Sequence, residues 1–411
     1  MIQYKDFRII LIFCVGFVFS ACDSSKKIEL MDQKMALKYY KSATKSNNKY
    51  SNELLFMLLN DGKQKNKNVF FSSYSLISAL SMVCEGAEGK TKNEMINALS
   101  LVNDHSRKIS FQSLYSLINK KKSAYQLKSV NALWFDNECE LESDYLDVIQ
   151  TSYYGSAEKL DFKNDSENAR LYINNWFENE TNRKIKNLIP RGGVHPNTKI
   201  VIGNAIYFKG KWEDKFEKFL TEEKEFHNSN SSISKIPMMH TCTSMKYSEN
   251  DFSQVVEIPY ENHELSFIVI LPKELDHAFT VEEISSVLDG KRKSMLVHMS
   301  MPKFKLEEQY DMEEYLQKGG INTAFSDLAN FKQMSKTENI KVSRCLHKSF
   351  IEVDENGTEA AAATAVIVDL ACTMPKEKPK IVEFNMDHPF LFAIRHNKTG
   401  TILFMGSIKK L

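Results

Sequence analysis

The sequence predicts an α+β fold with mostly antiparallel sheets. Helix-like segments are concentrated early in the chain and strand-like segments late, and there is no regular βαβ or internal repeat. The chain has 411 residues, of which 42% are hydrophobic and 11% aromatic. It can therefore bury the core of one large domain or of two ordinary ones.

Apolar spacing locates the main elements. In NELLFMLLNDG, three leucines share one helical face and Gly62 favours a stop. NVFFSSYSLISALSMV opens as a short strand and continues as a helix. Further helices are expected at about 165–181, 281–288 and 312–318. Strands are expected in LKSVNALWFD, KIVIGNAIYFKGKW, QVVEIPY, LSFIVILP, VHMSMPKFKL and LFAIRHNKTGTILFMGSI.

Charge and cysteine usage exclude several function classes. The 54 basic and 53 acidic residues nearly cancel, and no finger spacing or phosphate-binding glycine loop is present, so nucleic-acid binding is not expected. The seven cysteines predict neither a disulfide framework nor a metal site, and no cofactor is expected. Four of them are expected to be small, buried or half-buried apolar residues: Cys84, Cys139, Cys242 and Cys345.

A hydrolase is one alternative, and the sequence offers little for it. There is no G-x-S-x-G elbow and no H-E-x-x-H spacing. Cys345 and His347 lie two apart on an expected strand and so share a face, but no third group that would orient them is evident.

We expect residues 1–21 to be a secretory signal peptide, because a charged head precedes an apolar run of residues 9–19. FSAC resembles a bacterial lipobox, although Phe19 departs from the usual aliphatic residue. Cleavage before Cys22 would leave this cysteine to be acylated, with 22–47 as tether and lead-in. Each buried methylene of such an anchor contributes ~0.8 kcal/mol to membrane binding. An ordinary signal peptide cut near a cysteine is the alternative.

Residues 356–379 are too long for an ordinary connection. Loops longer than ~12–15 residues are usually functional or disordered. EAAAAT favours helix and AVIV favours strand, which is unusual for a linker. A flexible linker between two parts of a sheet is the plain alternative.

As a strand, this segment would have two unlike faces, because side chains alternate. Both charged residues fall on one face, which would carry Glu359, Ala361, Ala363, Ala365, Ile367 and Asp369. The other face would carry only uncharged residues: Thr358, Ala360, Ala362, Thr364, Val366, Val368 and Leu370. The pattern is typical of a strand that can enter a sheet beneath a helix layer.

The energy of such an insertion would be large. About a dozen new ladder hydrogen bonds, each contributing ~0.5–1.5 kcal/mol, total on the order of 10 kcal/mol. Ordinary domains are stable by only ~5–15 kcal/mol. A protein with this segment exposed would therefore be metastable, and cutting the segment would free one end to enter.

Six segments together resemble the serpin family, in matching order over roughly residues 48–411. They are NVFFSSYSLISALSMV, IVIGNAIYFKGKW, EFHNSNSSISKIPMM, MPKFKLEEQYDM, LHKSFIEVDENGTEAAAATA and DHPFLFAIRHNKTGTILFMGSI. The resemblance implies a single domain at 48–411 with three mostly antiparallel sheets, about nine helices and an exposed reactive-centre loop at about 356–379.

The resemblance also implies a suicide inhibitor of proteases and not an enzyme. Family spacing, counted from Glu355, puts the scissile bond at Ala371–Cys372, after which 357–370 would insert. A slip of one residue would place Leu370 at the bond. The loop hinge would comprise Glu355, Gly357, Thr358, Glu359, Ala360, Ala361 and Ala362. Cys372 is either a reactive thiol or a small residue in a serine-like role.

Two supporting clusters follow from the same resemblance. A hydrogen-bond cluster beneath the central sheet, the shutter, would comprise Ser72, Ser75, Asn204 and His347. The breach, where insertion begins, would comprise Trp212, Lys303 and Glu355.

The expected partner is a target protease, held as a covalent acyl-enzyme by a monomeric inhibitor. Alanine before the bond suits elastase-like or subtilisin-like serine proteases, and Leu370 suits papain-like cysteine proteases. The expected location is the cell envelope, outer membrane or cell surface, through the lipid on Cys22. The alternative function is a non-inhibitory binding or chaperone lipoprotein of the same fold, which would be expected to carry proline or charge in the hinge.

Overall fold

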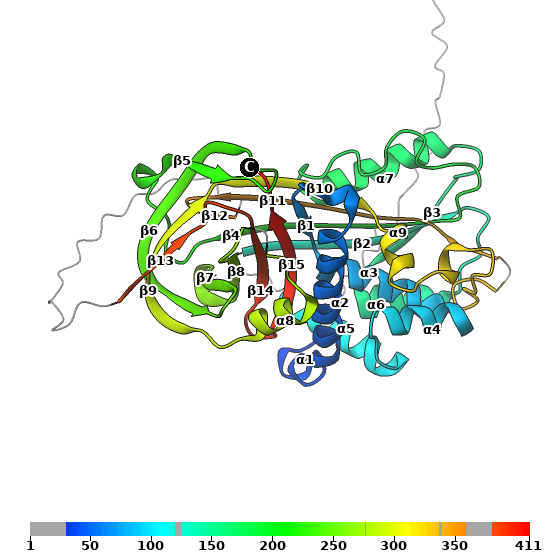
Figure 1. Ribbon diagram of the computed structural model, residues 1–411. Helices are drawn as coiled ribbons and strands as arrows, with labels where there is room; N and C mark the ends of the chain where they lie inside the picture. The colour runs from blue at the N-terminus through cyan, green and yellow to red at the C-terminus, as the bar shows by residue number, and fades with distance from the viewer. Residues whose placement is uncertain (1–29, 120–124, 276, 337–338, 359–379) are drawn as a thin grey trace, which may run out of the picture.

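The computed structural model describes residues 30–119, 125–275, 277–336, 339–358 and 380–411 (Figure 1). Three helices lie at the predicted positions near 165–181, 281–288 and 312–318, which confirms those predictions. The described residues form nine α-helices: α1 (Gln33–Tyr39), α2 (Lys41–Leu59), α3 (Ser73–Gly86), α4 (Gly89–Ala98), α5 (Asp104–Ile118), α6 (Ser143–Tyr153), α7 (Ser166–Glu180), α8 (Val281–Asp289) and α9 (Glu313–Lys318).

A six-stranded sheet runs along the molecule (Figure 1). Two of its neighbouring pairs, β11 with β4 and β2 with β3, are parallel, and the others are antiparallel. In spatial order its strands are β10 (Phe304–Asp311), β11 (Val342–Asp354), β12 (Gly357–Thr358), β4 (Ile200–Lys211), β2 (Tyr125–Asp136) and β3 (Ser156–Leu160).

A nine-stranded sheet contains the remaining strands. The long strand β6 pairs with β7 near one end and with β5 near the other, so the predicted third set of strands is present and is hydrogen-bonded to the second set. The order is β1 (Val69–Phe71), β15 (Thr401–Ile408), β14 (Phe390–His396), β8 (Leu265–Pro272), β7 (Ser253–Pro259), β6 (Ile233–Glu249), β9 (Lys293–Pro302) and β13 (Ile381–Asn385), with β5 (Glu222–His227) on β6.

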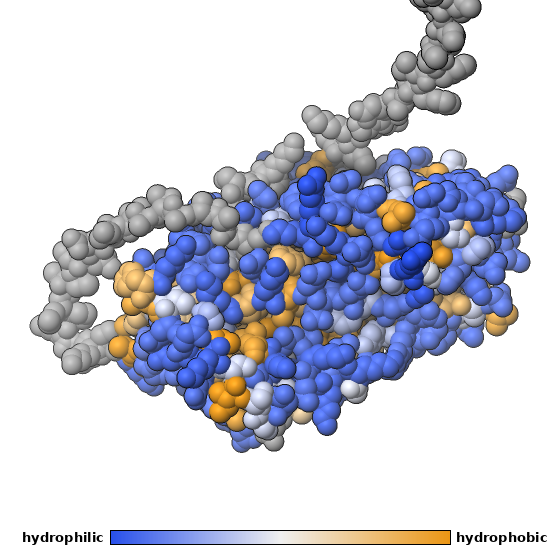
Figure 2. Space-filling model, turned by 90° about the horizontal axis from the view of Figure 1, so that it is seen from above, coloured by the Kyte–Doolittle hydropathy of each residue, from blue (hydrophilic) through white to orange (hydrophobic). Residues whose placement is uncertain are grey.

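Helix α3 lies in the centre of the fold and packs against strands of both sheets. All 14 of its residues are buried. Small side chains at Ser75, Ser78, Ala79 and Ser81 let its backbone approach the strands closely, which is why this apolar helix tolerates so many serines. Seen from above, most of the surface is hydrophilic, and hydrophobic side chains gather in the left half of the view (Figure 2).

The packed part of the chain starts before residue 48, because the predicted boundary falls inside α2. The Met31 amide donates to Ser116 Oγ at 3.0 Å, and Asn47 Nδ2 donates to the Ile402 carbonyl at 2.7 Å. Among the helices of the described residues, none is both long and apolar enough to cross a membrane. The predicted signal peptide and Cys22 lie outside the described residues.

Three of the described cysteines are buried as predicted, namely Cys84, Cys139 and Cys345. The prediction for Cys242 is wrong, because this residue is exposed. Its strand, β6, alternates buried and exposed side chains along much of its length, so one face meets solvent.

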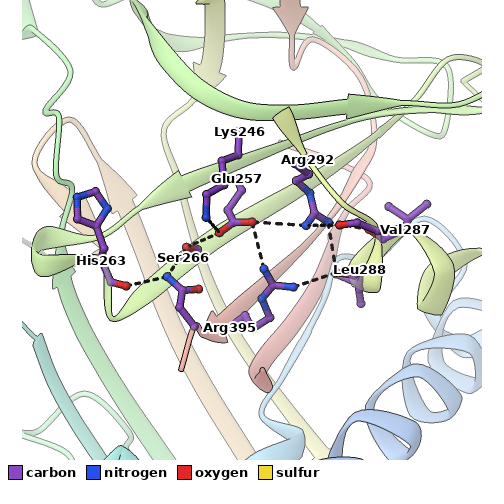
Figure 3. A network of polar contacts seen from close by, with 10 residues as sticks. Lys246, Glu257, His263, Ser266, Val287, Leu288, Arg292 and Arg395 are labelled. Atoms are coloured by element: carbon purple, nitrogen blue, oxygen red, sulfur yellow. Dashed lines mark hydrogen bonds and ion pairs between the residues drawn. The ribbon is translucent and has the colours of Figure 1, made fainter. Parts of the chain in front are cut away.

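Glu257 on β7 is a buried carboxylate, and its contacts with Lys246, Ser266 and Arg395 join four strands of the nine-stranded sheet (Figure 3). Its Oε2 accepts hydrogen bonds from Arg395 at 3.1 Å and Arg292 at 3.4 Å. Its Oε1 accepts hydrogen bonds from Ser266 Oγ at 3.0 Å and Lys246 Nζ at 3.3 Å. Burial by itself would raise the pKa of Glu257, but these cations and the hydroxyl outweigh burial and hold its pKa below the usual value.

The same two arginines cap the end of α8. Arg292 donates to the Val287 carbonyl at 2.6 Å, and Arg395 donates to the Leu288 carbonyl at 2.9 Å. Cations are favourable at a helix C-terminus, where carbonyl groups lack partners within the helix. Glu257 thus fixes the position of α8 through the arginines that it binds.

Replacing Glu257 by glutamine should lower the free energy of unfolding by about 3 kcal/mol, because buried cations lose their counter-ion. Urea unfolding followed by tryptophan fluorescence measures the change. The control is Glu249→Gln, since Glu249 is exposed and pairs with Lys273, and such a pair contributes ~0–1 kcal/mol. Equal stability of the two variants would contradict the network's role.

Candidate functional site

The parallel pairing between β4 and β11 covers only part of their length. It starts at Ile200 with Val342 and ends at Ile206 with Ser349. Beyond that point both strands continue, to Lys211 and Asp354 respectively. The six-stranded sheet is therefore closed at one end and open at the other.

The short strand β12 occupies the far end of this opening (Figure 1). Gly357 and Thr358 pair with β11 on one side and with Lys211 and Gly210 of β4 on the other. Both pairings are antiparallel. The start of the predicted hinge is therefore already a strand of the sheet.

Thr358 is fully buried on the inner face of β12. Its Oγ1 lies 2.7 Å from the hydroxyl of Tyr260, which follows β7. The ring of Tyr260 stacks on Trp212 at 4.7 Å between centroids, and it meets Phe208 edge to face. A small β-branched residue with one hydroxyl fits this position, because the pocket offers one polar partner among aromatic rings.

Gly357 combines positive φ with close backbone contact. Its φ is +150°, and a Cβ at this position would lie 2.1 Å from the Gly210 carbonyl oxygen. Any side chain would therefore push β12 away from β4. This steric requirement explains why glycine precedes the buried threonine.

Glu355 fixes the chain just before β12. Lys303 Nζ contacts both carboxylate oxygens, at 3.0 and 2.9 Å, and Thr221 Oγ1 donates at 2.9 Å. The backbone carbonyl of Glu355 accepts from the Phe216 amide at 3.0 Å. Burial by itself would raise the pKa of Glu355, but the Lys303 ammonium, the residue's own amide and Thr221 outweigh it and lower the pKa.

Trp212 joins β4 to the turn that leads into β12. Its indole Nε1 donates to the Asp354 carbonyl at 2.9 Å, and its amide donates to the Asn356 carbonyl at 3.0 Å. Asp354 Oδ1 in turn accepts from the amides of Asn356 and Gly357. The structure therefore brings the three predicted breach residues together around one turn.

The four predicted shutter residues also lie together, beneath the closed part of the sheet. His347 of β11 is the register partner of Asn204 of β4, and its Nδ1 lies 2.6 Å from Asn204 Oδ1. The Asn204 amide contacts Ser75 Oγ at 2.5 Å. Ser72 closes the cluster, because its amide lies 3.0 Å from His347 Nε2.

These contacts define the protonation of His347. Nε2 accepts the Ser72 amide hydrogen, so Nδ1 carries the proton and donates it to Asn204. The ring is fully buried, and burial lowers the pKa of His347 to about 3. His347 is therefore a neutral donor and acceptor that bridges α3, β11 and β4.

The Cys–His hydrolase alternative finds no support at this position. Cys345 is fully buried, and burial raises the pKa of its thiol far above the usual value. A thiol of this kind does not form the thiolate that nucleophilic catalysis requires. Among the described residues, no group of three metal-ligating side chains is gathered either.

The residues beyond β12 lie outside the described part of the chain. These are Glu359, Ala360, Ala361, Ala362, Ala371 and Cys372. Sequence reasoning missed several contributors to the site, among them Tyr260, Thr221 and Ser129, the last of which lies 2.9 Å from Ser75 Oγ. The only signal for Ser129 was its position on strand β2 (Tyr125–Asp136), where alternate side chains face the interior.

Acid should lower the free energy of unfolding, because His347 is neutral in the folded protein and takes up a proton on unfolding. In the unfolded chain the His347 ring is protonated near pH 6.5, whereas in the folded protein it is protonated only near pH 3. The free energy of unfolding is therefore highest above pH 6.5 and falls as the pH drops toward 3. At pH 5 this loss is about 2 kcal/mol. His347→Gln should remove that part of the acid dependence, as measured by urea unfolding between pH 7 and 5.

The control for this measurement is His105→Gln, since His105 is exposed on α5. This variant should keep the acid dependence of the unchanged protein. The same slope in all three proteins would mean that His347 does not titrate as its burial requires.

Three comparisons relate this geometry to known proteins. A family model described as Serpin (serine protease inhibitor) matches residues 45–411. An uncharacterized serpin-like protein of Thermococcus kodakarensis is 40% identical over 362 residues, covering 86% of this chain and 83% of that protein. Serpin B8 of Homo sapiens is 38% identical over 362 residues, covering 86% and 95% respectively.

Solved structures agree with the sequence matches. The crystal structure of maspin has a TM-score of 0.82 at 28% identity, and it covers 91% of this chain and 100% of that chain. The fold predicted from the sequence is thus confirmed, with its mixed sheets and nine helices in the described residues. Because one family model spans nearly the whole described chain and relatives align over most of their length, the chain belongs to the serpin family.

Proposed function

We propose that this protein is an irreversible protease inhibitor that acts as a suicide substrate. The protease would cut the loop near Ala371–Cys372, and residues 357–370 would then enter the six-stranded sheet between β4 and β11. Family membership supports the general activity, because the matching model is that of serine protease inhibitors. The mechanism rests on the geometry of the sheet.

The single observation that carries the proposal is the position of β12. It already lies between β4 and β11 at the open end of the sheet, with Thr358 buried. Continuing its alternation would place Ala360 and Ala362 on the inner face and Glu359 outward, toward solvent. Insertion would therefore extend a strand that is already present in the sheet.

The chemistry of the trap belongs to the protease. Its serine or cysteine attacks the carbonyl carbon of Ala371, the bond to Cys372 breaks, and the new amino terminus leaves with the downstream fragment. The acyl group stays on the protease as an ester or thioester. Insertion would carry this acyl-enzyme along before water attacks it. Elastase-like, subtilisin-like and papain-like enzymes are the proposed targets.

The two clusters would control when insertion proceeds. The Glu355 contacts hold the turn that precedes β12, and an entering strand has this turn as its fixed end. The bond between His347 and Asn204 spans the two strands that must separate. Both clusters would therefore set the barrier to insertion rather than the chemistry of cleavage.

Residues 1–21 and Cys22 are proposed to export the protein and anchor it to an envelope membrane through acylation. The apolar run and the FSAC sequence support this, and they lie outside the described residues. An anchored inhibitor would protect the envelope from proteases that reach it.

The experiment is incubation with elastase, subtilisin and papain. We expect a complex that survives denaturant, together with a released fragment whose mass places its first residue at Cys372. Protein cut within the loop by a protease that it does not trap should melt on the order of 10 °C higher, because ~10 kcal/mol of insertion energy is divided by the unfolding entropy. Clean cleavage with neither adduct nor raised melting temperature would support the binding or chaperone alternative.

Thr358→Arg should convert the inhibitor into a substrate. A buried unpaired charge is strongly unfavourable, so the variant strand would enter slowly and water would release the protease first. The fraction of protease trapped should fall at least about tenfold while cleavage continues, as measured by gel densitometry of the complex. Thr151→Arg, at an exposed threonine of α6, is the control and should inhibit normally. Undiminished trapping by Thr358→Arg would contradict the insertion mechanism.

A further inference from the structure

A hollow of about 240 Å³ lies where the end of α2 meets the ends of three strands of the nine-stranded sheet, β8, β14 and β15. Its lining comes from Leu59, the segment after β8, the start of β14 and the end of β15. Clefts that hold drug-sized ligands usually measure ~300–1,000 Å³. An occupant of this hollow is therefore smaller than a typical drug.

The walls of the hollow are mostly apolar. Phe279, Phe390 and Leu391 contribute largely buried side chains, and Leu275 stands exposed. The ring of His277 also lines the hollow, and it stacks on Phe252 with 5.1 Å between centroids. These surfaces suit an aliphatic or aromatic body.

Among the described residues, the charge of the lining is one-sided. None of the described residues that line the hollow is Asp or Glu, whereas Lys409 and His277 both line it. His277 already has an acidic neighbour, since its Nε2 lies 3.4 Å from Glu283. Lys409 is the other cation, and it makes no ion pair with any described residue.

The ammonium of Lys409 is poorly satisfied for a half-buried group. Its Nζ donates to the Gln64 carbonyl at 3.4 Å, which is long for a hydrogen bond. Burial lowers the pKa of Lys409, as expected for a cation that has lost water without gaining a counter-ion. A carboxylate beside it would supply the missing charge.

A second polar group lies on the same side of the chain. Ser407 is two residues before Lys409, and both line the hollow. The Ser407 side chain is largely buried. An ammonium and a hydroxyl together can bind the two oxygens of one carboxylate.

We propose that this hollow binds a small monocarboxylic acid with an apolar body, of about the size of octanoate. The carboxylate lies against Lys409 and Ser407, and the chain lies against Leu59, Phe279 and Leu391. None of the described hinge residues, Glu355, Gly357 and Thr358, lines the hollow. Because the lining strands are part of the folded core, bound ligand stabilises the folded protein.

Isothermal titration of the mature protein with sodium octanoate tests the proposal. We expect saturable binding of one octanoate per chain and a rise in melting temperature with octanoate concentration. Octan-1-ol has the same chain without the charge, and it should bind at least about tenfold more weakly. No saturable heat with octanoate up to millimolar concentration would overturn the proposal.

Lys409→Met keeps the apolar stem and removes the charge. Octanoate should bind this variant at least about tenfold more weakly, while binding of octan-1-ol should be unchanged. Lys410→Met is the matched control, because Lys410 is the exposed neighbour and does not line the hollow. Circular dichroism establishes that both variants are folded. Equal octanoate affinity in the two variants would show that Lys409 does not hold the carboxylate.

Discussion

The hydrogen bonds between β4 and β11 stop at Ile206 and Ser349, and the shape of the site follows from this stop. On the closed side, His347 and Asn204 join the two strands. On the open side, β12 lies between the two strands and pairs with both of them. A longer strand between β4 and β11 would require the residue pairs from Ile206 and Ser349 toward Asn204 and His347 to separate.

Different kinds of contact hold β4 and β11 at the open and at the closed end, and burial explains the difference. At the open end, Glu355 pairs with Lys303, whose side chain is 37% exposed, so the ammonium keeps part of its water. At the closed end the His347 side chain is fully buried, and an unpaired charge on its ring would be strongly unfavourable. A neutral histidine that donates through Nδ1 and accepts through Nε2 gives two directed bonds without a buried charge.

Much of the site was predictable because its residues lie in segments with recognisable order along the chain. Trp212, Lys303 and Glu355 were expected together, and they surround one turn. Tyr260 and Thr221 were not expected, although both hold the residues around β12. No local pattern marks them, because their contacts depend on how the nine-stranded sheet and its connections lie against the six-stranded sheet.

Local patterns along the chain were enough to predict the main helices and strands, the uncharged face of the segment after Gly357, and the glycine and threonine that can enter a sheet. No local pattern predicts that β4 and β11 pair in parallel along part of their length and leave a place that β12 fills. These strands are separated by more than a hundred residues, so their register depends on packing around α3 and not on local preference. The same reason applies to Lys409, whose missing counter-ion becomes evident only when distant segments enclose it.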